Sequence, residues 1–390
     1  MTPTSARARN ALSWVEIDTG ALVSNLHAFR GRLLPGTELA HVVKANAYGH
    51  GLELIAAEDE ASGIVHRLAV IPVEELVRVR EAGVRLPVLI LGYVPLSAWR
   101  TVVDAEGTPV VFNRESLEAL SEEAAKRGRE VAVHVKVETG THRYGVSEAE
   151  LPAFLDDLAR LPGLRFEGIT THFANIEDTT EHGYAMGQLE AFHRALRIAH
   201  AAGFEAAVAN TACSAATILF PESHMGLVRV GIASYGVWPS KETRVSAAHT
   251  EGADLALRPV LTWKTRVGQV KRVPAGAYVG YGCSWRAPVE TVLAVLPLGY
   301  ADGFDRRLGN AGHVLVRGRR APVRGRVCMN VVMVDVTHIP EVALEDEVVV
   351  LGSQGEERIT VDQMAGWCGT IGYEVLARLP EHLPRVRVPS

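Results

Sequence analysis

Several residue types and motifs are scarce in this chain. Six of its 390 residues are lysines, against 34 arginines, so ordinary surface usage does not explain a lysine at a special position. The four cysteines have no paired spacing, which argues against a disulfide framework or a zinc site. No apolar run reaches the roughly 18 residues of a membrane helix, and the arginines of residues 1–10 precede no apolar signal segment. We therefore expect a cytoplasmic protein without a disulfide framework or a bound metal.

Signals for nucleotide or nucleic-acid binding are also missing. The formal net charge is -5, the arginines are scattered and 22% of the residues are charged, which gives no electrostatic basis for binding nucleic acid or a membrane. No Walker A loop or Gly-x-Gly-x-x-Gly follows an apolar run, and no His-Glu-x-x-His pattern occurs. Nucleotides, nucleic acids and membranes are therefore not expected as partners.

Short apolar runs alternate with charged, helix-like segments between residues 38 and 235. Helical spacing is clearest at 116–127 and 188–202, which Gly128 and Gly203 are placed to end. Eight such units in about 200 residues match an α/β fold built as a parallel (β/α)8 TIM barrel, with a doubly wound sheet as the weaker alternative. The eight expected strands are 38–44, 67–71, 88–91, 109–112, 131–137, 166–172, 206–210 and 227–235.

The pattern becomes β-rich, with Gly or Pro turns, after about residue 245. We expect a barrel domain over residues 11–245 and a second, mostly antiparallel β domain at the C-terminus over residues 246–390. The segment 13–18 also predicts a strand, and because it precedes the first barrel helix we expect it to pair with the C-terminal domain. The strands expected in that domain are 261–273, 278–284, 292–298, 313–316, 331–336 and 347–351.

One of the rare lysines, Lys44, lies in the string Val-Val-Lys-Ala-Asn-Ala-Tyr-Gly-His-Gly. The apolar run before it predicts a buried parallel strand, and Gly49 and Gly51 break any helical continuation, so Lys44 stands at the carboxyl end of a strand. An amine whose pKa is lowered by burial or by a neighbouring cation can form a Schiff base with an aldehyde. The string therefore predicts imine chemistry.

Polar residues also follow other expected strands, at the end where active sites of such barrels form. Lys136 and Arg143 follow the fifth strand, His172 ends the sixth, and Arg229 lies in the eighth. The neighbours of Arg229 are Leu227, Val228 and Val230, an apolar context that argues against a surface salt bridge. These four residues are candidates for the chemistry of the site.

A phosphate site is expected after the seventh and eighth strands of such a barrel. There the sequence supplies Ser214, followed by two alanines, and then Gly231 and Ile232. Small residues let backbone N–H groups approach an anion. An imine-forming lysine beside a phosphate-binding turn indicates the cofactor pyridoxal 5'-phosphate.

With these motifs in this order, the chain resembles the alanine racemase family over nearly its full length. The string around Lys44 is one of the shared motifs. The others are Glu138–Gly145 (Glu-Thr-Gly-Thr-His-Arg-Tyr-Gly), Thr171–Ala174, Arg229–Gly236, Tyr281-Gly282, Gly299–Gly303 (Gly-Tyr-Ala-Asp-Gly) and Gly369–Glu374.

The resemblance implies a racemase that interconverts L-alanine and D-alanine through a pyridoxal phosphate aldimine and provides D-alanine for peptidoglycan. Racemisation needs two acid/base groups on opposite faces of the substrate Cα. The resemblance gives one face to Lys44 and the other to Tyr281, which would come from the partner subunit of a homodimer. A free tyrosine, with a pKa of about 10, needs cationic surroundings to act as a base at neutral pH. His172 and Arg229 are the neighbours expected to provide them.

The resemblance also assigns the remaining contacts. Arg229 would face the pyridine nitrogen of the cofactor, and Arg143 would bind its phenolic oxygen and the substrate carboxylate. Lys136 matches a position that can be carbamylated in relatives; a partly solvated lysine is the alternative. Tyr300 and Met329 match positions that line the substrate channel and pocket, although simple packing is an equal alternative for Met329. The phosphate contacts would be Tyr48, Ser214, Tyr373 and the backbone of Gly231 and Ile232.

Three positions depart from the family pattern. Cys213 stands where an asparagine usually precedes the phosphate serine, and Asn330 replaces an aspartate after the Cys-Met pair. The arginine motif reads Thr141-His142 where methionine is more usual. These changes leave open a racemase of broader range, toward serine or other small amino acids.

Two other functions are compatible with a lysine-bearing barrel. A related pyridoxal phosphate decarboxylase would need a carboxylate opposite the pyridine nitrogen and a Cys-Asp motif from the partner subunit, and neither is found. A non-catalytic pyridoxal phosphate carrier would typically lack the second domain, in which Tyr281 lies. The sequence favours the racemase.

Overall fold

The structure, a computed structural model, describes residues 10–250 and 254–388. They form two compact units, divided mainly at Arg258/Pro259. One unit contains the described residues of 23–47 and 52–258, and the other contains those of 1–22, 48–51 and 259–390. The boundary expected at 245/246 lies inside a helix, α11 (Lys241–Ala247). Within the described residues, we find no helix of the length and apolar character that membrane crossing requires.

The unit around residues 23–258 contains eight parallel strands in the ring order β9-β2-β3-β4-β5-β6-β7-β8. The ring closes between its first and last members, where the Gly226 amide donates to the Ala209 carbonyl at 3.1 Å and the Arg229 amide to the Ala212 carbonyl at 3.0 Å. All eight strands expected from the sequence are present. Their bounds are β2 (Glu38–Val42), β3 (Arg67–Val70), β4 (Val88–Ile90), β5 (Gly107–Val111), β6 (Val131–Lys136), β7 (Leu164–Thr170), β8 (Val208–Asn210) and β9 (Leu227–Val230).

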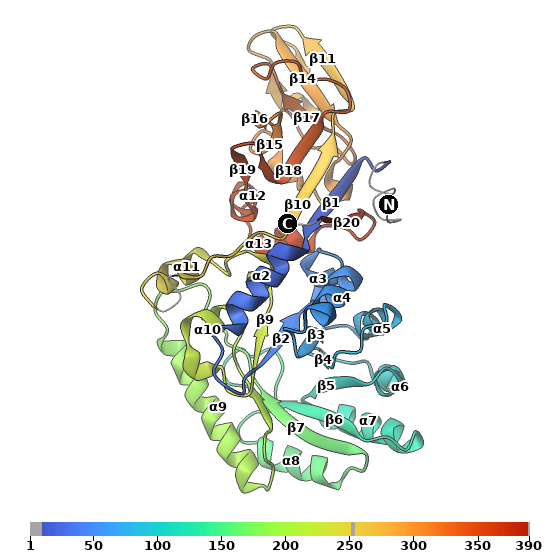
Figure 1. Cartoon of the computed structure of the whole chain (residues 1–390), viewed down its shortest axis with the longest axis vertical. Coiled ribbons are helices and arrows are strands. Elements are labelled where there is room, and N and C mark those ends of the chain that lie inside the picture. The colour runs from blue at the N-terminus through green and yellow to red at the C-terminus, as the bar shows by residue number, and fades with distance from the viewer. Residues whose placement is uncertain (1–9, 251–253, 389–390) are drawn as a thin grey trace. The chain divides into compact units, whose positions relative to one another are not determined.

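Helices flank the outside of these strands (Figure 1). The two helices expected from spacing are α7 (Arg114–Lys126) and α9 (Gly183–Ala201), and Gly128 and Gly203 follow them with φ of 59° and 82°. A left-handed residue at such a stop favours glycine. The other helices of this unit are α4 (Leu52–Ser62), α5 (Val73–Glu81), α6 (Trp99–Asp104), α8 (Leu151–Arg160), α10 (Ser214–Leu219) and α11, while α2 (Thr19–Arg30) follows the strand β1.

Amphipathic spacing explains how these helices attach to the strands. On α8 the buried residues Leu151, Phe154, Leu155 and Leu158 repeat every three or four positions and so form one face. The strands they cover are apolar runs such as Val88–Ile90, which is buried at every residue. Strands covered on both faces need no alternating polar residues, which is why the sequence showed them as continuous apolar runs.

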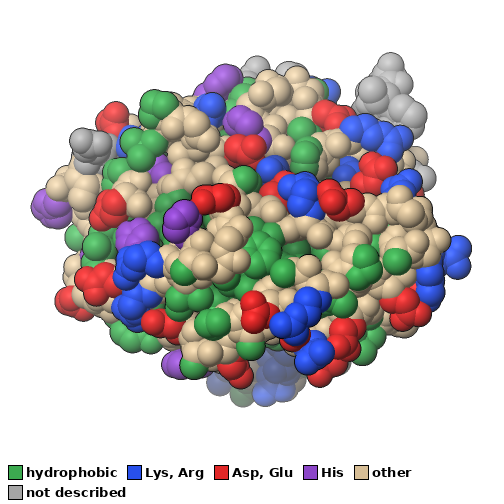
Figure 2. Space-filling view, turned by 90° about the horizontal axis from the view of Figure 1, so that it is seen from below, with side chains coloured by type: hydrophobic (Ala, Val, Ile, Leu, Met, Phe, Trp, Pro, Cys, Tyr) green, Lys and Arg blue, Asp and Glu red, His purple; other side chains and the backbone are tan. Residues whose placement is uncertain are grey.

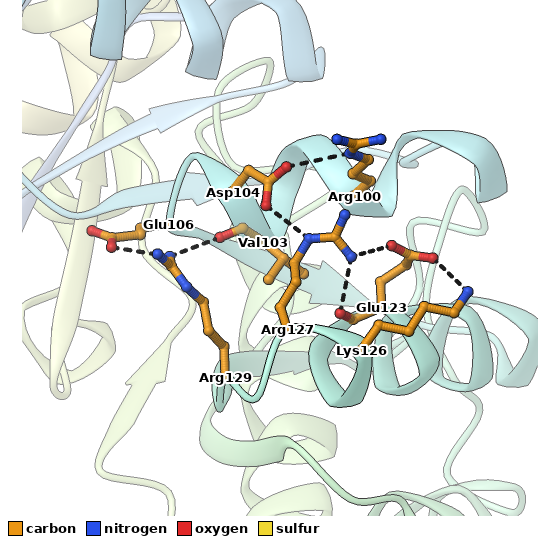
Figure 3. Close-up of polar contacts among 8 residues, drawn as sticks. All are labelled: Arg100, Val103, Asp104, Glu106, Glu123, Lys126, Arg127 and Arg129. Atoms are coloured by element: carbon orange, nitrogen blue, oxygen red, sulfur yellow. Dashed lines mark hydrogen bonds and ion pairs between the residues drawn. The ribbon is translucent and has the colours of Figure 1, made fainter.

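Charged side chains of both signs alternate on the face of the molecule shown in Figure 2. On the barrel unit, a shallow pocket of 680 Å³ between α6 and α7 is lined mostly by such residues. Figure 3 shows that its charges pair with one another, since Arg127 contacts both Asp104 and Glu123, at 2.7 Å and 2.5 Å. Lys126 adds a contact to Glu123 at 2.9 Å. We interpret this pocket as a surface ion-pair cluster between neighbouring helices.

The second unit is built mostly from antiparallel strands. Its largest sheet has the order β16-β15-β18-β10-β1-β20, with β19 paired to β18. The expected pairing of the segment 13–18 occurs there, because β1 (Ser13–Asp18) pairs antiparallel with β10 (Leu261–Arg266) and parallel with β20 (Arg385–Val388). The other strands are β15 (His313–Val316), β16 (Arg319–Pro322), β18 (Glu347–Gln354) and β19 (Glu357–Ile359).

Two small sheets and two helices also lie among the described residues of this unit. One sheet has the order β11-β14-β17, from β11 (Gln269–Val273), β14 (Thr291–Leu296) and β17 (Val332–Asp335). The other pairs β12 (Tyr278–Val279) with β13 (Trp285–Arg286), and the helices are α12 (Val361–Cys368) and α13 (Gly372–Ala377).

Three expected strands are shorter than the sequence indicated. The single strand expected over 261–273 is two strands, β10 and β11, which join different sheets on either side of Val267 and Gly268. The strand expected over 278–284 ends at Val279, before a 3-10 turn at Tyr281–Cys283. The strand expected over 227–235 ends at Val230, because Gly231 (φ -118°, ψ -104°) turns the chain into a 3-10 turn at Ile232–Tyr235. Their apolar residues continue through these bends, so hydrophobicity alone did not show the breaks.

Candidate active site

Lys44 follows the carboxyl end of β2 in the barrel unit, as the sequence indicated. Its side chain is partly buried, and this burial is the main reason why its pKa lies below the usual value; the neighbouring cations Arg143 and Arg229 lower the pKa further. The carboxylates of Glu75 and Glu177 oppose the shift. A larger fraction of the amine is therefore neutral at a given pH, which is the form that attacks a carbonyl.

The three residues after Lys44 form a left-handed turn. Ala45, Asn46 and Ala47 have φ near +54° and ψ near +50°, a region that costs a non-glycine residue about 1–2 kcal/mol. Two side chains hold this backbone: the Asn46 amide donates to Glu75 Oε1 at 3.0 Å, and Asn46 Oδ1 accepts from the Leu52 amide at 2.9 Å. The turn aims the chain away from β2 immediately after the lysine and so sets the direction of the Lys44 backbone.

We expect Glu75→Gln to lower the free energy of unfolding by about 1–3 kcal/mol, because Glu75 is buried and both its oxygens accept backbone N–H groups, from Asn46 and Ile71. A glutamine offers one acceptor and turns an N–H toward the other donor. Urea unfolding measures the change, with Glu122→Gln as the matched control, since that exposed glutamate pairs with Lys126 on the surface of α7. Equal stability of the two variants would show that Glu75 does not hold the turn.

Arg229 is the most enclosed cation of the site, with 5% of its surface exposed. Burial lowers its pKa to about 10, so the guanidinium still keeps its protons at neutral pH and can only donate hydrogen bonds. Its Nη2 donates to the Thr171 carbonyl at 2.9 Å and to the Thr211 carbonyl at 3.2 Å. Its Nη1 donates to Thr170 Oγ1 at 3.1 Å and to Asn210 Oδ1. These bonds fix the plane of the guanidinium.

His172 lies against Arg229, with its Nδ1 3.3 Å from Arg229 Nη2. Because arginine can only donate, Nδ1 is the acceptor and the imidazole proton is on Nε2. Burial, followed by the charges of Arg229, Lys136 and Arg143, holds the pKa of His172 well below its usual value. The ring is therefore neutral, and the expectation that His172 supplies positive charge is wrong; among this pair, only Arg229 does.

Lys136, at the end of β6, faces the same group of cations. Burial and the nearby charges of Arg229 and Arg143 lower its pKa to about 7, while Glu138 acts in the opposite direction. Arg143 itself is exposed, on a loop where its amide donates to Glu138 Oε2 at 3.3 Å. A lysine in these surroundings is a neutral amine for much of the physiological pH range.

Ser214 begins α10 and lies beside Gly231, whose amide donates to Ser214 Oγ at 2.9 Å. Ser214 and Gly231, two of the residues expected to hold a phosphate, are thus neighbours at the ends of β8 and β9. Cys213, which precedes Ser214, is buried, and burial raises the pKa of its thiol to about 12, so it brings no charge to this end. The departure at Cys213 therefore leaves the charge of the expected phosphate site unchanged.

Comparison with known proteins assigns the family. The family model for the alanine racemase N-terminal domain matches residues 17–239, and that for the C-terminal domain matches residues 260–387. The chain belongs to the alanine racemase family. An alanine racemase of Desulfovibrio desulfuricans is 40% identical over 375 residues, covering 96% of this chain and 98% of the relative. The family's reaction is an isomerisation, so the chain is assigned to the isomerases.

Solved alanine racemases have the same fold. The enzyme of Clostridium difficile 630 superposes with a TM-score of 0.91 at 31% identity and covers 98% of this chain and 97% of its own. The enzyme of Bartonella henselae, described with covalently bound pyridoxal phosphate, gives a TM-score of 0.83 at 27% identity, over 97% of this chain and 100% of its own.

The remaining residues that the family motif marks lie in the second unit. Tyr48 and Tyr373 are neighbours there, with ring centroids 6.1 Å apart. Tyr281, on its 3-10 turn, has 73% of its surface exposed, and Tyr300 and Met329 are exposed as well. A surface pocket of 560 Å³, lined largely by apolar side chains, adjoins Tyr281. The structure thus groups Lys44, Lys136, Arg143, His172, Ser214, Arg229, Gly231 and Ile232 in one unit and Tyr48, Tyr281, Tyr300, Met329 and Tyr373 in the other.

Sequence reasoning missed several residues that hold this site. Thr141, noted only as a departure from the family pattern, donates from its hydroxyl to the His172 carbonyl at 2.6 Å. Thr170 and Asn210 orient Arg229, and Glu75 supports the turn after Lys44. Asn210 lies at the end of an expected strand, and this position could have indicated that it belongs to the site. Glu75 lies in an ordinary amphipathic helix, and nothing in the sequence indicated its role.

Proposed function

We propose that this protein interconverts L-alanine and D-alanine with pyridoxal 5'-phosphate linked to Lys44. The observation that carries the proposal is a partly buried lysine with a lowered pKa, at a barrel strand end, beside a buried arginine, in a chain of the alanine racemase family. The donor set fits the cofactor: an amine for its aldehyde, Arg229 for its ring nitrogen, and a serine hydroxyl and two turn amides for its phosphate. The covalently bound pyridoxal phosphate of the Bartonella relative supports this fit.

When bound, the cofactor supplies an electron-withdrawing ring that makes the substrate Cα proton acidic. Lys44 would take or return this proton on one face, and Tyr281 on the other. Arg229 would donate a hydrogen bond to the ring nitrogen without transferring its proton, since its pKa of about 10 keeps it charged. A ring nitrogen that accepts this hydrogen bond would stay unprotonated. The ring would then withdraw electrons less strongly than a ring protonated beside a carboxylate, which limits side reactions such as transamination.

The other residues would bind and orient. Ser214 and the amides of Gly231 and Ile232 would hold the phosphate together with Tyr48 and Tyr373, whose rings are neighbours. Arg143 would bind the phenolic oxygen of the cofactor and the substrate carboxylate. His172, neutral and bonded to Arg229, would keep the guanidinium in place and present its Nε2 proton as a donor.

We also propose a homodimer in which Tyr281, Tyr300 and Met329 of one subunit complete the site of the other. The exposure of all three side chains supports this arrangement, since an exposed tyrosine beside an apolar surface pocket is available to a partner. In the cell, the enzyme would work in the cytoplasm and provide D-alanine for peptidoglycan.

Lys136 is expected to be carbamylated above about pH 7. Its pKa of about 7 leaves roughly nine in ten of the amines neutral at pH 8, and a neutral amine adds CO2 to give a carbamate and one released proton. The product places an anion beside Arg143, where the protonated amine would be a repelling cation. Carbon-13 NMR with labelled bicarbonate should show a carbamate signal that weakens below pH 7 and is missing in Lys136→Met. An unmodified amine at pH 8 would contradict the assignment.

The direct test of function is deuterium exchange at Cα, followed in D2O over a panel of amino acids with the purified protein. Exchange with inversion, fastest for alanine, is the expected result. Comparable rates with serine would favour the racemase of broader range. The observation that favours this alternative is the uncharged Asn330, at a position where relatives usually have an aspartate. Release of CO2 without inversion would indicate a decarboxylase, and bound cofactor without any exchange would indicate a carrier.

A further inference from the structure

A fully buried series of hydrogen-bonded polar side chains links α4, β2 and the turn after β9. Asp59 Oδ2 lies 2.7 Å from His41 Nδ1, and His41 Nε2 lies 2.6 Å from Ser234 Oγ. All three residues are completely shielded from solvent. None belongs to the groups assigned above to catalysis or binding, so the cost of burying three polar residues calls for an explanation.

The bonds of Ser234 decide where the protons lie. Its hydroxyl donates to the Gly231 carbonyl at 2.6 Å, so it must accept from His41, and Nε2 of His41 carries a proton. The second proton lies between His41 Nδ1 and Asp59. Burial raises the pKa of Asp59, and its other oxygen has no hydrogen-bond partner within the described residues, which favours the protonated carboxyl as donor to His41 Nδ1.

This order of bonds excludes a hydrolytic role for the Ser-His-Asp set. A serine nucleophile must donate its proton to the histidine, and here the serine donates to a carbonyl instead. No substrate can reach a hydroxyl with no exposed surface. The set must act through the backbone to which Ser234 is bonded.

That backbone is the peptide group between Gly231 and Ile232. The Gly231 carbonyl accepts both the Ser234 hydroxyl, at 2.6 Å, and the Ser234 amide, at 2.9 Å. Because a peptide group is planar and trans, the Gly231 C=O and the Ile232 N–H point in opposite directions and turn together. Fixing the carbonyl on Ser234 therefore aims the Ile232 amide toward the opposite side.

Two further bonds hold the turn on its other sides. Asn25 Nδ2 donates to the Ser234 carbonyl at 2.9 Å, and the Tyr235 hydroxyl donates to the Val42 carbonyl on β2 at 3.0 Å. The turn is thereby tied to the strand that leads to Lys44. Gly231 has no side chain to restrict its backbone, so these external bonds define its orientation.

We propose that Ser234, held by the His41–Asp59 pair, is a positioning residue for the phosphate of the cofactor: it orients the Gly231–Ile232 peptide whose amide binds that phosphate. This inference rests on the proposed function. It predicts an effect confined to the phosphate end, because the Ser234 hydroxyl bonds to the Gly231 carbonyl and to His41, and neither is among the groups expected around the pyridine ring.

The test compares two ligands on the cofactor-free protein: pyridoxal phosphate, and pyridoxal, which lacks the phosphate. We expect Ser234→Ala to weaken binding of pyridoxal phosphate about tenfold, the effect of one hydrogen bond, and to leave pyridoxal binding unchanged. Ser223→Ala is the matched control, since Ser223 is equally buried and also donates to the carbonyl three residues earlier in a 3-10 turn, at 2.7 Å. For Ser223→Ala, the ratio of the affinity for pyridoxal phosphate to the affinity for pyridoxal should equal that of the wild type.

Substitutions at Asp59 keep the proposal testable if Ser234→Ala does not fold. Asp59→Leu should lower the affinity ratio, because His41 loses its partner, whereas Asp59→Asn should retain it, because an amide can donate to Nδ1 and leave the Nε2 proton on Ser234. An unchanged ratio in Ser234→Ala and Asp59→Leu, or an equal loss for both ligands, would overturn the positioning role. A wild-type protein that binds neither ligand would instead refute the proposed function.

Discussion

Replacing Lys44 with alanine is expected to remove the covalent link to pyridoxal phosphate and to lower racemisation by roughly 10³-fold or more, since the variant loses both the imine-forming amine and one proton carrier. In the wild type, burial and the charges of Arg143 and Arg229 lower the pKa of the Lys44 amine. The variant keeps these surroundings but loses the amine. Borohydride reduction followed by peptide mass spectrometry measures the link, and inversion at Cα measures the rate.

Lys241→Ala is the matched control for this prediction, because Lys241 is an exposed lysine at the start of α11. It should keep both the covalent cofactor and the full rate. A small primary amine added to Lys44→Ala should restore part of the exchange by replacing the missing group. If reduction instead labelled Lys136 in the wild type, the assignment of the linking lysine would be wrong.

The barrel was predictable because its strands are covered on both faces. A fully buried strand such as Val88–Ile90 is a continuous apolar run, and this signal needs no partner to be recognised. In the second unit the short strands β13, β16, β19 and β20 were missed. β16 reads Arg-Arg-Ala-Pro and lies at the end of its sheet, where charge and proline are tolerated, so its pairing with β15 is visible only in three dimensions.

The polar residues that lie together at the strand ends of the barrel could be predicted, but the residues that support them could not. Lys44 stood out because lysine is rare, and Arg229 because its neighbours are apolar. The left-handed turn after Lys44 had no local signal, because Ala-Asn-Ala does not favour that conformation, and it depends on Glu75, 29 positions away. The neutral state of His172 likewise depends on its burial beside four basic side chains from other parts of the chain.

Replacing Tyr281 with phenylalanine is expected to lower racemisation by about 10²- to 10⁴-fold while leaving cofactor binding intact, because only the hydroxyl that exchanges the proton on the second face is lost. The side chain is 73% exposed, so the fold should not change. In D2O, the enantiomer whose proton faces Lys44 should still exchange without inversion. Tyr278→Phe is the control: it changes an exposed tyrosine of the neighbouring strand and keeps its ring over Arg286. Full racemisation by Tyr281→Phe would refute the two-base assignment.

Mixing the two inactive variants decides which subunit supplies Tyr281. If it acts in the partner's site, a dimer of one Lys44→Ala and one Tyr281→Phe subunit contains one complete site, with Lys44 from the second subunit and Tyr281 from the first. Random mixing should then restore about a quarter of the wild-type rate, because half of the dimers are mixed and each has one intact site of two. If Tyr281 served its own subunit, neither site of the mixed dimer would be complete, and mixing would restore nothing. Recovery of activity therefore requires a shared site, which neither single variant can establish.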